Sequence, residues 1–248
     1  MLALDKPLGP TSYQALCALR ELVPSLHGAK LGHAGRLDPL AEGLLVALVG
    51  DENKRSRDLR AQPKTYEVDV LFGISTDSCD SLGLVTALRD EVSLAPAALD
   101  EALARFTGTF AQRCPPFSQA RVGGRSLIGW GHAGVEVERP LIERTITSIA
   151  RGRLWRSDLG ALCDEAARRV GLVRGDFRQA AIAARWRELS RRDVSLPLAT
   201  LTVDCSAGTY MRALAADLGG VLGVPAMAWR IRRTRAGAVT LDGALVLP

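Results

Sequence analysis

Short strand-like segments alternate with helical segments along the whole chain, and this irregular order constrains the fold more than any other feature. Residues 43–50 form an apolar run that is short enough for a buried strand. Residues 64–72 alternate polar and apolar side chains, as a strand with one covered face does, and residues 143–154 and 198–205 also have strand patterns. Because no regular strand–helix–strand period links them, we predict an α+β fold with a mixed, largely antiparallel central sheet flanked by helices.

Helical spacing of apolar residues separates these strands. Residues 12–22 follow a Gly-Pro-Thr-Ser turn, and Thr11 or Ser12 is the candidate N-cap of the helix that we predict there. Another helix is predicted at residues 209–218, where the Gly-Gly pair at positions 219–220 would end it. Further helices are predicted at residues 54–60, 96–106 and 158–192. The length of 248 residues suits one large domain, with or without an appendage.

The composition excludes several classes of protein. A content of 47% hydrophobic and 24% charged residues is typical of a globular protein and not of a disordered chain. No apolar run is long enough for a membrane span, and the N-terminus lacks the regions of a secretory signal. The five cysteines are scattered, without a CxxC pair, and only three histidines accompany them, so neither a disulfide framework nor a zinc site is indicated. We expect a cytoplasmic protein without a metal.

Arginine carries most of the positive charge, which totals +5 net. Only four of the 32 basic residues are lysine. The guanidinium group offers paired donors to phosphate, so this excess favours a nucleic-acid partner, although a high-GC coding sequence explains it equally well. Arginines are dense at residues 151–192, where eleven face five acids, and at residues 230–235, which hold four. Both segments are candidate phosphate-binding surfaces.

An aspartate in a loop bracketed by glycine and proline is the most distinctive chemical feature. The usual motifs of dinucleotide and nucleoside-triphosphate binding, zinc proteases and serine hydrolases are absent from the sequence. In residues 35–43, Pro39 directs Asp38 toward extended backbone, and the flanking glycines let the main chain approach a ligand. Taken alone, these residues favour the simpler interpretation that Asp38 caps the following turn. A second feature is Arg212, which follows a strand and a turn in residues 205–212.

Seven segments, in order, resemble the TruB family of pseudouridine synthases. The Asp38 loop and the Gly-Thr-Tyr-x-Arg segment are the specific ones, and together the matches cover most of the chain from Leu4 to about Gly237. Residues 76–80 are closer to the bacterial tRNA branch of the family than to the RNA-guided branch. The matching segments are residues 6–12, 32–43, 64–68, 73–80, 115–118, 205–212 and 231–235.

The resemblance implies the pseudouridine-synthase fold and the isomerisation of uridine to pseudouridine in RNA, with U55 in the T loop of tRNA as the expected target. The N1–C1′ bond breaks, the uracil turns, and C5 joins C1′, so no cofactor is expected. A uridine stacked in a folded loop must first be flipped out. Whether the carboxylate attacks C1′ or C6, or assists elimination to a glycal, stays open. The implied partner of this cytoplasmic, monomeric enzyme is the T arm of tRNA, without a membrane or metal.

Three residues match the family's catalytic positions. Asp38 corresponds to the catalytic carboxylate, and Arg212 to the arginine that pairs with it. A guanidinium in that place offsets the desolvation that would raise the pKa of a buried carboxyl. Tyr66 corresponds to the tyrosine that stacks on the target uracil, a contact worth about 1–3 kcal/mol, although a half-buried strand tyrosine is the simpler interpretation.

Further positions match the family's substrate and RNA contacts. His33 would follow the flipped nucleotide, although a histidine that only satisfies the backbone of a turn is the alternative. Lys6 belongs to the N-terminal motif and is expected to shape the pocket wall, while Ile231 replaces the usual leucine against the base. The arginines of residues 230–235 would face phosphates. The candidate contacts are Lys6, His33, Tyr210, Ile231, Arg232, Arg233 and Arg235.

The chain departs from the family pattern in four places. Arg36 occupies the position of a small residue or threonine and could touch RNA or compete for Asp38. The family's tyrosine-containing motifs after Pro116 are missing. Residues 158–192 resemble a helical insertion in a catalytic domain that spans residues 1–248; they could contact tRNA or be a solvated helical pair packed on the core. The family's C-terminal, PUA-like RNA-binding domain is expected to be absent or vestigial.

Two other functions fit the same scaffold. One is a catalytically inactive factor that binds or folds tRNA, and the presence of Asp38, Tyr66 and Arg212 together disfavours it. The other is a structural subunit of an RNA-guided particle, which the expected absence of a C-terminal domain disfavours. Release of a C5 label from uridine separates an isomerase from both.

Overall fold

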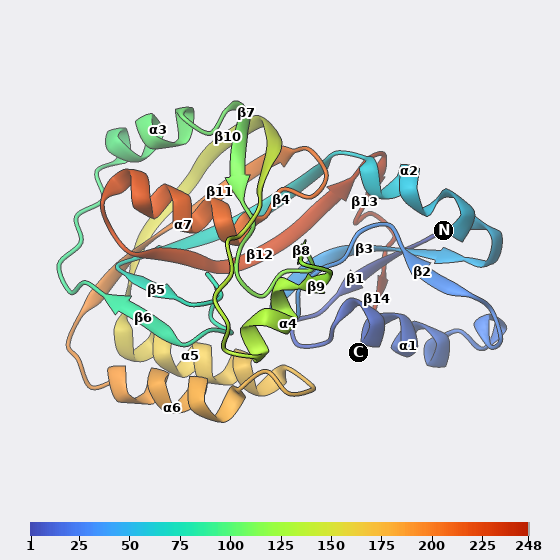
Figure 1. The fold of residues 1–248 in the computed structure, drawn as a ribbon, viewed down its shortest axis with the longest axis horizontal. Coiled ribbons are helices and arrows are strands. Elements are labelled where there is room, and N and C mark those ends of the chain that lie inside the picture. Colours follow the sequence, from blue (N-terminus) through green and yellow to red (C-terminus); the bar gives the residue numbers. More distant parts are fainter. Residues whose placement is uncertain (248) are drawn as a thin grey trace.

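A twisted ten-stranded sheet runs through the computed structural model, which describes residues 1–247 (Figure 1). Its main path has the order β14-β1-β3-β12-β4-β11-β10-β7, while β2 pairs with β3 and β13 with β12. Among the strand pairs of this sheet within residues 1–247, only β1–β14 and β12–β3 are parallel, so the predicted mixed, largely antiparallel sheet is confirmed. The strands are β1 (Leu2–Lys6), β2 (Leu31–His33), β3 (Ala41–Val49), β4 (Lys64–Phe72), β7 (Gly108–Arg113), β10 (Leu141–Asp158), β11 (Ser195–Cys205), β12 (Ala226–Ala236), β13 (Val239–Thr240) and β14 (Leu245–Val246).

Helices cover both faces of the central strands. Alternate residues of a strand point to opposite faces, and this period divides the core in two. Val70 packs in the cluster that holds α3 and α7, whereas its neighbour Leu71 packs in the cluster that holds α5 and α6. No helix within residues 1–247 has the length and apolar character needed to cross a membrane. The longer helices are α1 (Ser12–Leu22), α3 (Pro96–Ala104), α5 (Leu159–Leu172), α6 (Gln179–Leu189) and α7 (Met211–Leu222).

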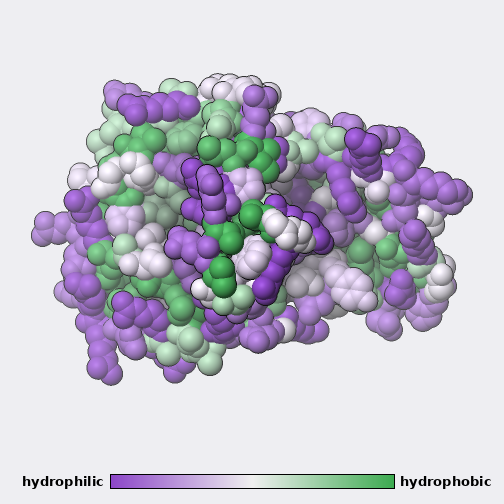
Figure 2. All heavy atoms as spheres, in the orientation of Figure 1, coloured by the Kyte–Doolittle hydropathy of each residue, from purple (hydrophilic) through white to green (hydrophobic). Residues whose placement is uncertain are grey.

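Short elements complete the fold around this sheet. A small hairpin of β5 and β6 lies beside α5 and α6 (Figure 1). Hydrophilic side chains dominate the periphery of the molecular face shown in Figure 2. In the chain segment between β7 and β10, a two-stranded hairpin precedes a short helix of six residues. These elements are η1 (Pro24–Leu26), η2 (Gly50–Arg55), α2 (Ser56–Ala61), β5 (Ile74–Thr76), β6 (Val85–Leu88), β8 (Arg121–Val122), β9 (Arg125–Ser126) and α4 (Leu127–His132).

The Arg-rich segment 158–192 contains two helices, as predicted. The helices α5 and α6 pack against each other and against the sheet, and the side chains of Ile182 and Trp186 are fully buried. Because apolar side chains of both helices are buried against the sheet, this helix pair is a part of the core. A contact between the same helices and tRNA stays a prediction.

The helix predicted at residues 209–218 differs from α7. The helix starts at Met211, continues through the two glycines, and ends at Gly223, which adopts φ +67° as its C-cap. A Cβ at Gly219 would lie 2.6 Å from the carbonyl oxygen of Val224, so this glycine allows close packing and does not end the helix. The prediction was wrong because glycine serves both purposes.

Candidate active site

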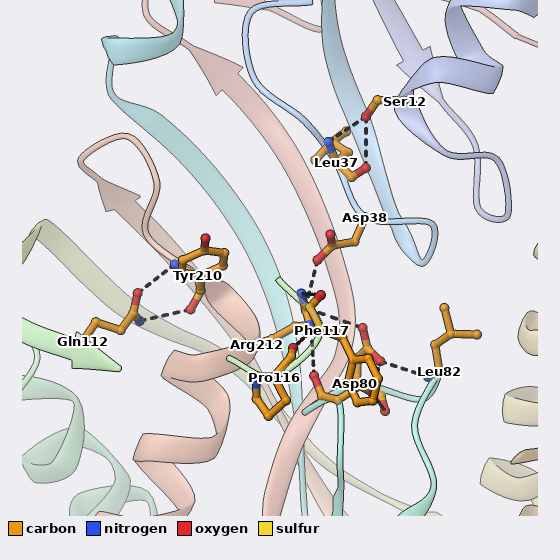
Figure 3. Close-up of polar contacts among 11 residues, drawn as sticks. Ser12, Leu37, Asp38, Asp80, Leu82, Gln112, Pro116, Phe117, Tyr210 and Arg212 are labelled. Carbon is orange, nitrogen blue, oxygen red and sulfur yellow. Dashed lines mark hydrogen bonds and ion pairs between the residues drawn. The ribbon is translucent and has the colours of Figure 1, made fainter. Parts of the chain in front are cut away.

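The Asp38 loop is held in place by the start of α1. The hydroxyl of Ser12 donates to the carbonyl of Leu37 over 3.0 Å and accepts from the backbone N–H of Leu37 over 2.8 Å (Figure 3). Thr11 is the N-cap of α1 and forms a reciprocal capping box with Gln14, so the helix start is itself well defined. Asp38 follows directly, with its side chain 39% exposed. The local sequence therefore presents a carboxylate on a rigid loop.

Lys6, at the end of β1, holds the same loop through hydrogen bonds to backbone carbonyls. Its ammonium group is fully buried and donates to the carbonyls of Pro7 (2.8 Å), Pro10 (2.8 Å) and Pro39 (3.4 Å). Burial lowers the pKa of Lys6 to about 8, although Asp38 and Glu42 oppose the shift. The prediction that Lys6 contacts RNA is wrong, because its side chain is fully buried and does not line the cavity; its effect on the pocket wall is indirect.

Arg212 binds the catalytic candidate Asp38 from the first turn of α7. Its Nε donates to Oδ2 of Asp38 over 2.8 Å, and its side chain is only 5% exposed. The remaining donors reach the carbonyls of Ser78 (2.8 Å), Pro116 (3.3 Å) and Phe117 (3.5 Å) (Figure 3). Burial by itself lowers the pKa of Arg212, but nearby carboxylates outweigh it and hold the pKa above its ordinary value. The guanidinium therefore stays charged.

Asp80 is a second carboxylate on Arg212, and the sequence did not reveal its role. Its Oδ2 lies 3.7 Å from Nε of Arg212, while Oδ1 accepts from the hydroxyl of Ser78 (2.6 Å) and the N–H of Leu82 (3.0 Å). Burial raises the pKa of Asp80, and Arg212 opposes that shift. The motif at residues 73–80 was the only sign of this residue, because nothing local links it to Asp38.

A cavity of about 550 Å³ opens beside the Asp38–Arg212 pair. This volume falls within the range of roughly 300–1,000 Å³ that is usual for small-ligand sites. Burial raises the pKa of the Tyr66 phenol despite the neighbouring Arg233, so the phenol remains neutral and its O–H is a donor. The fold thus brings around this cavity seven candidate site residues that the sequence had singled out: His33, Asp38, Tyr66, Tyr210, Arg212, Ile231 and Arg233.

Tyr210 is fixed through its backbone. Its N–H donates to Oε1 of Gln112 over 2.8 Å, and its carbonyl accepts from Nε2 of the same side chain over 3.1 Å (Figure 3). Gln112 lies on β7 and is buried, so this amide joins the sheet edge to the start of α7. Burial also raises the pKa of the Tyr210 phenol.

His33 lies on the cavity wall in its neutral form. Burial, helped by the adjacent Arg60 and Arg36, lowers the pKa of His33 to about 4. Its Nδ1 is buried and, among the described residues, has no hydrogen-bond partner. His33 lies in β2 and not in a turn, and its contact with a flipped nucleotide stays a prediction. Arg36 also lines the cavity, and Asp38 pairs with Arg212 and not with Arg36.

The prediction that Arg233 faces phosphate, together with its neighbouring arginines, is wrong. Its side chain is 1% exposed, and its donors reach the carbonyls of Leu44 (2.7 Å), Gly35 (3.0 Å) and Arg36 (3.3 Å). Arg233 therefore supports the Asp38 loop from within the protein. The reason is the period of β12, which turns the side chain of Arg233, like that of Ile231, toward the interior.

Arg232 and Arg235 are more accessible, but each is paired within the protein. Arg232 donates to Asp5 over 2.7 Å. Arg235 donates to Asp204 over 2.9 Å and keeps 43% of its side chain exposed. A phosphate contact by either residue stays a prediction.

The arrangement is suited to acid–base or nucleophilic chemistry on a small ligand in the cavity. The carboxylate of Asp38 lies at the edge of a partly apolar cavity, and the permanently charged guanidinium of Arg212 holds one of its oxygens. Arg212 holds Oδ2 of Asp38, so Oδ1 is the carboxylate oxygen that a bound ligand could reach. Among the described residues, no cluster of three or more metal-binding side chains accompanies the pair.

One known protein family matches a large part of the chain. A family model described as TruB family pseudouridylate synthase (N terminal domain) matches residues 24–159. That segment includes Asp38, Tyr66 and Asp80. It ends at the beginning of α5, before Arg212.

Curated relatives align with the whole chain. The tRNA pseudouridine synthase B of Ralstonia nicotianae is 38% identical over 247 residues, covering 100% of this chain and 66% of that protein. The protein of the same name from Cupriavidus pinatubonensis is 38% identical over 250 residues, covering 100% and 65%. The chain therefore spans slightly less than two thirds of the length of these relatives.

Solved structures share the fold at low sequence identity. The crystal structure of a Cbf5-Nop10-Gar1 complex has a TM-score of 0.62 at 20% identity, over 99% of this chain and 51% of that chain. An H/ACA RNP bound to a substrate RNA containing 2′-deoxyuridine has a TM-score of 0.59 at 19% identity, over 99% and 50%. The similarity confirms the predicted fold.

Proposed function

Because the chain belongs to the TruB family of pseudouridylate synthases, we propose that it isomerises uridine to pseudouridine in tRNA, at position 55 of the T loop. One observation carries the proposal: Asp38 is bound by the buried Arg212 at the wall of a cavity that Tyr66 also lines. We further propose that the protein acts as a monomer on the T arm, in the cytoplasm.

The proposed reaction begins with a uridine turned out of its loop into the cavity, at a cost of roughly a few kcal/mol. Tyr66 and Ile231 line the space in which the flat uracil ring would lie. Stacking on an aromatic ring compensates for part of the lost base stacking. The neutral imidazole of His33 and the nearby Arg36 line the same cavity and would contact the neighbouring nucleotides.

Asp38 would then act as the ionised carboxylate beside the glycosidic bond. The C1′–N1 bond breaks, the uracil rotates, the C1′–C5 bond forms, C5 loses its proton, and N1 gains one. Attack at C1′, attack at C6 and elimination to a glycal each require this carboxylate to be charged. Arg212 favours the charged form, because its guanidinium is permanently protonated and donates directly to the carboxylate.

The test uses an unmodified T-arm stem–loop RNA with tritium at C5 of uridine. The intact chain should release tritium, and the Asp38→Ala variant should release none while it still binds the RNA. Glu42→Gln is the matched control, because Glu42 lies on the same segment but pairs with Arg230. Binding of RNA without release by the intact chain would contradict the proposal and favour a tRNA-binding or folding factor.

A further inference from the structure

The connection between α5 and α6 forms a part of the active-site wall. Phe177 from this connection lines the cavity of about 550 Å³ together with Asp38 and Tyr66. A smaller cavity of about 90 Å³ lies next to it, and both Phe177 and Arg178 line that space with Asp38 and Arg212. The segment that resembled an insertion therefore reaches the reaction site.

Hydrogen bonds of one side chain give the connection a defined shape. Nε2 of Gln179 donates to the carbonyls of Val173 (3.1 Å) and Gly175 (2.6 Å), and Oε1 accepts from the N–H of Phe177 (2.9 Å). Arg178 adopts φ +64°, an uncommon conformation for a residue with a side chain. These hydrogen bonds thus fix the backbone of the connection at the residue that carries the Arg178 side chain.

Arg178 makes two contacts outside its own helix pair. Nη1 donates to Oδ2 of Asp77 over 2.7 Å, and Nη2 donates to Oδ1 over 3.1 Å. The same guanidinium lies over the ring of Phe117, 4.5 Å from its centroid. A planar fork is suited to both contacts at once, because it binds a carboxylate edge-on and stacks on a ring with its face.

These two partners adjoin the carbonyls that orient Arg212. Asp77 precedes Ser78, whose carbonyl accepts from Nη1 of Arg212 over 2.8 Å. The carbonyl of Phe117 accepts from Nη2 of Arg212 over 3.5 Å. Arg178 thus connects two segments that are far apart in the chain, and both support the guanidinium that holds Asp38.

We propose that Arg178 is a positioning residue, which sets the orientation of the Asp38–Arg212 pair through Asp77 and Phe117. The inference rests on the proposed function, because it concerns the rate of that same reaction. Arg178 bonds to Asp77 and does not line the larger cavity, so we expect its loss to lower the rate of turnover and to leave RNA binding nearly unchanged. A misplacement of about 1 Å at a catalytic group can cost about 100-fold in rate.

The experiment measures tritium release, RNA affinity and thermal stability for the full chain and its variants. Arg178→Ala and Asp77→Asn should each lower kcat by about 10- to 100-fold, with little change in the Kd for RNA. Arg178→Lys, which keeps the charge but not the fork, should fall between Arg178→Ala and the intact chain. The double variant should be no slower than the slower single variant, because both changes break one connection. Arg185→Ala is the control, since its partner Glu188 lies on the exposed side of α6.

Each other result has a definite meaning. An intact chain that releases no tritium overturns the proposed function and this inference with it. If the intact chain is active, three results overturn the inference alone: equal kcat values for Arg178→Ala and Arg185→Ala, a loss confined to RNA affinity, or multiplied effects in the double variant. If Arg178→Ala fails to fold, Arg178→Lys and Asp77→Asn decide between the same outcomes.

Discussion

Nε of Arg212 donates to Oδ2 of Asp38 over 2.8 Å, although 174 positions separate the two residues in the chain. The arginine is almost fully buried and the aspartate is partly open to the cavity. This asymmetry favours catalysis, because the positive group is fixed by protein acceptors while the negative group remains accessible to substrate.

Replacement of Arg212 should damage both stability and activity. Arg212→Ala leaves the buried Asp80 without its counter-charge, and loss of one partner from a buried pair costs about 3–5 kcal/mol in the free energy of unfolding. Urea unfolding measures this loss, and tritium release should vanish. Arg230→Ala is the comparison, because its more exposed pair with Glu42 should contribute less than about 1 kcal/mol. Equal losses in the two variants would contradict this assignment.

Arg233→Ala should destabilise the fold and loosen the Asp38 loop. The variant removes donors from the carbonyls of Leu44, Gly35 and Arg36, and each buried carbonyl that loses its partner costs about 1–3 kcal/mol. Urea unfolding should show the loss. Wild-type stability combined with weakened RNA binding would restore the original expectation that Arg233 faces phosphate.

Arg235→Ala should act on RNA binding more than on folding. Its exposed guanidinium can approach a phosphate, so the dependence of log K on log salt should become shallower by about one unit. Filter binding of the T-arm RNA at several salt concentrations measures the slope. An unchanged slope would mean that the pair with Asp204 is the whole role of Arg235.

The stability of the protein should fall as the pH drops through the range in which free histidine titrates. The pKa of His33 is lowered from 6.5 to about 4 in the folded state, first by burial, so only the unfolded chain gains this proton between those values. The contribution is complete above pH 6.5 and is lost toward pH 4. Unfolding at about pH 7.5 and about pH 5 should therefore show a smaller difference for His33→Gln than for the intact chain. An equal difference would contradict the assignment.

Gly9→Ala should be more harmful than Gly28→Ala. Both glycines have positive φ, +107° and +80°, so both substitutions carry backbone strain of about 1 kcal/mol. At Gly9 a Cβ would also lie 2.5 Å from the carbonyl oxygen of Leu172 at the end of α5, whereas nothing lies within 4 Å at Gly28. Thermal unfolding should rank the two variants in that order. The reverse order would mean that α5 does not pack on the N-terminal segment.

Local patterns predicted several elements to the residue. The bounds of β4 and α1 agree with the segments predicted from alternation and helical spacing, and Thr11 is the N-cap. Such features depend on near neighbours in the chain, through side-chain period and capping. The glycine–proline bracket around Asp38 is also a local feature, although its role as a candidate carboxylate came from the resemblance to the TruB family.

Contacts between distant segments could not be predicted in this way. The chain segment 230–235 resembled one basic surface, yet Arg233 is buried and Arg235 is exposed. A register irregularity in β12 between these two residues, against β4, separates their surroundings. Asp80 and Arg178 were missed for a related reason, since their importance comes entirely from where Arg212 lies.

The amino-acid order alone thus determined most of the secondary structure and the loop that presents Asp38, while the resemblance to the TruB family supplied Tyr66 and Arg212 as its candidate partners. Only the tertiary structure decided which charged groups are enclosed and which face solvent. The physical reason is that helical and strand patterns follow from nearest neighbours, whereas the cost or benefit of a charge depends on the dielectric and the partners around it. Those surroundings are assembled from segments as distant as β3, β12 and the connection between α5 and α6.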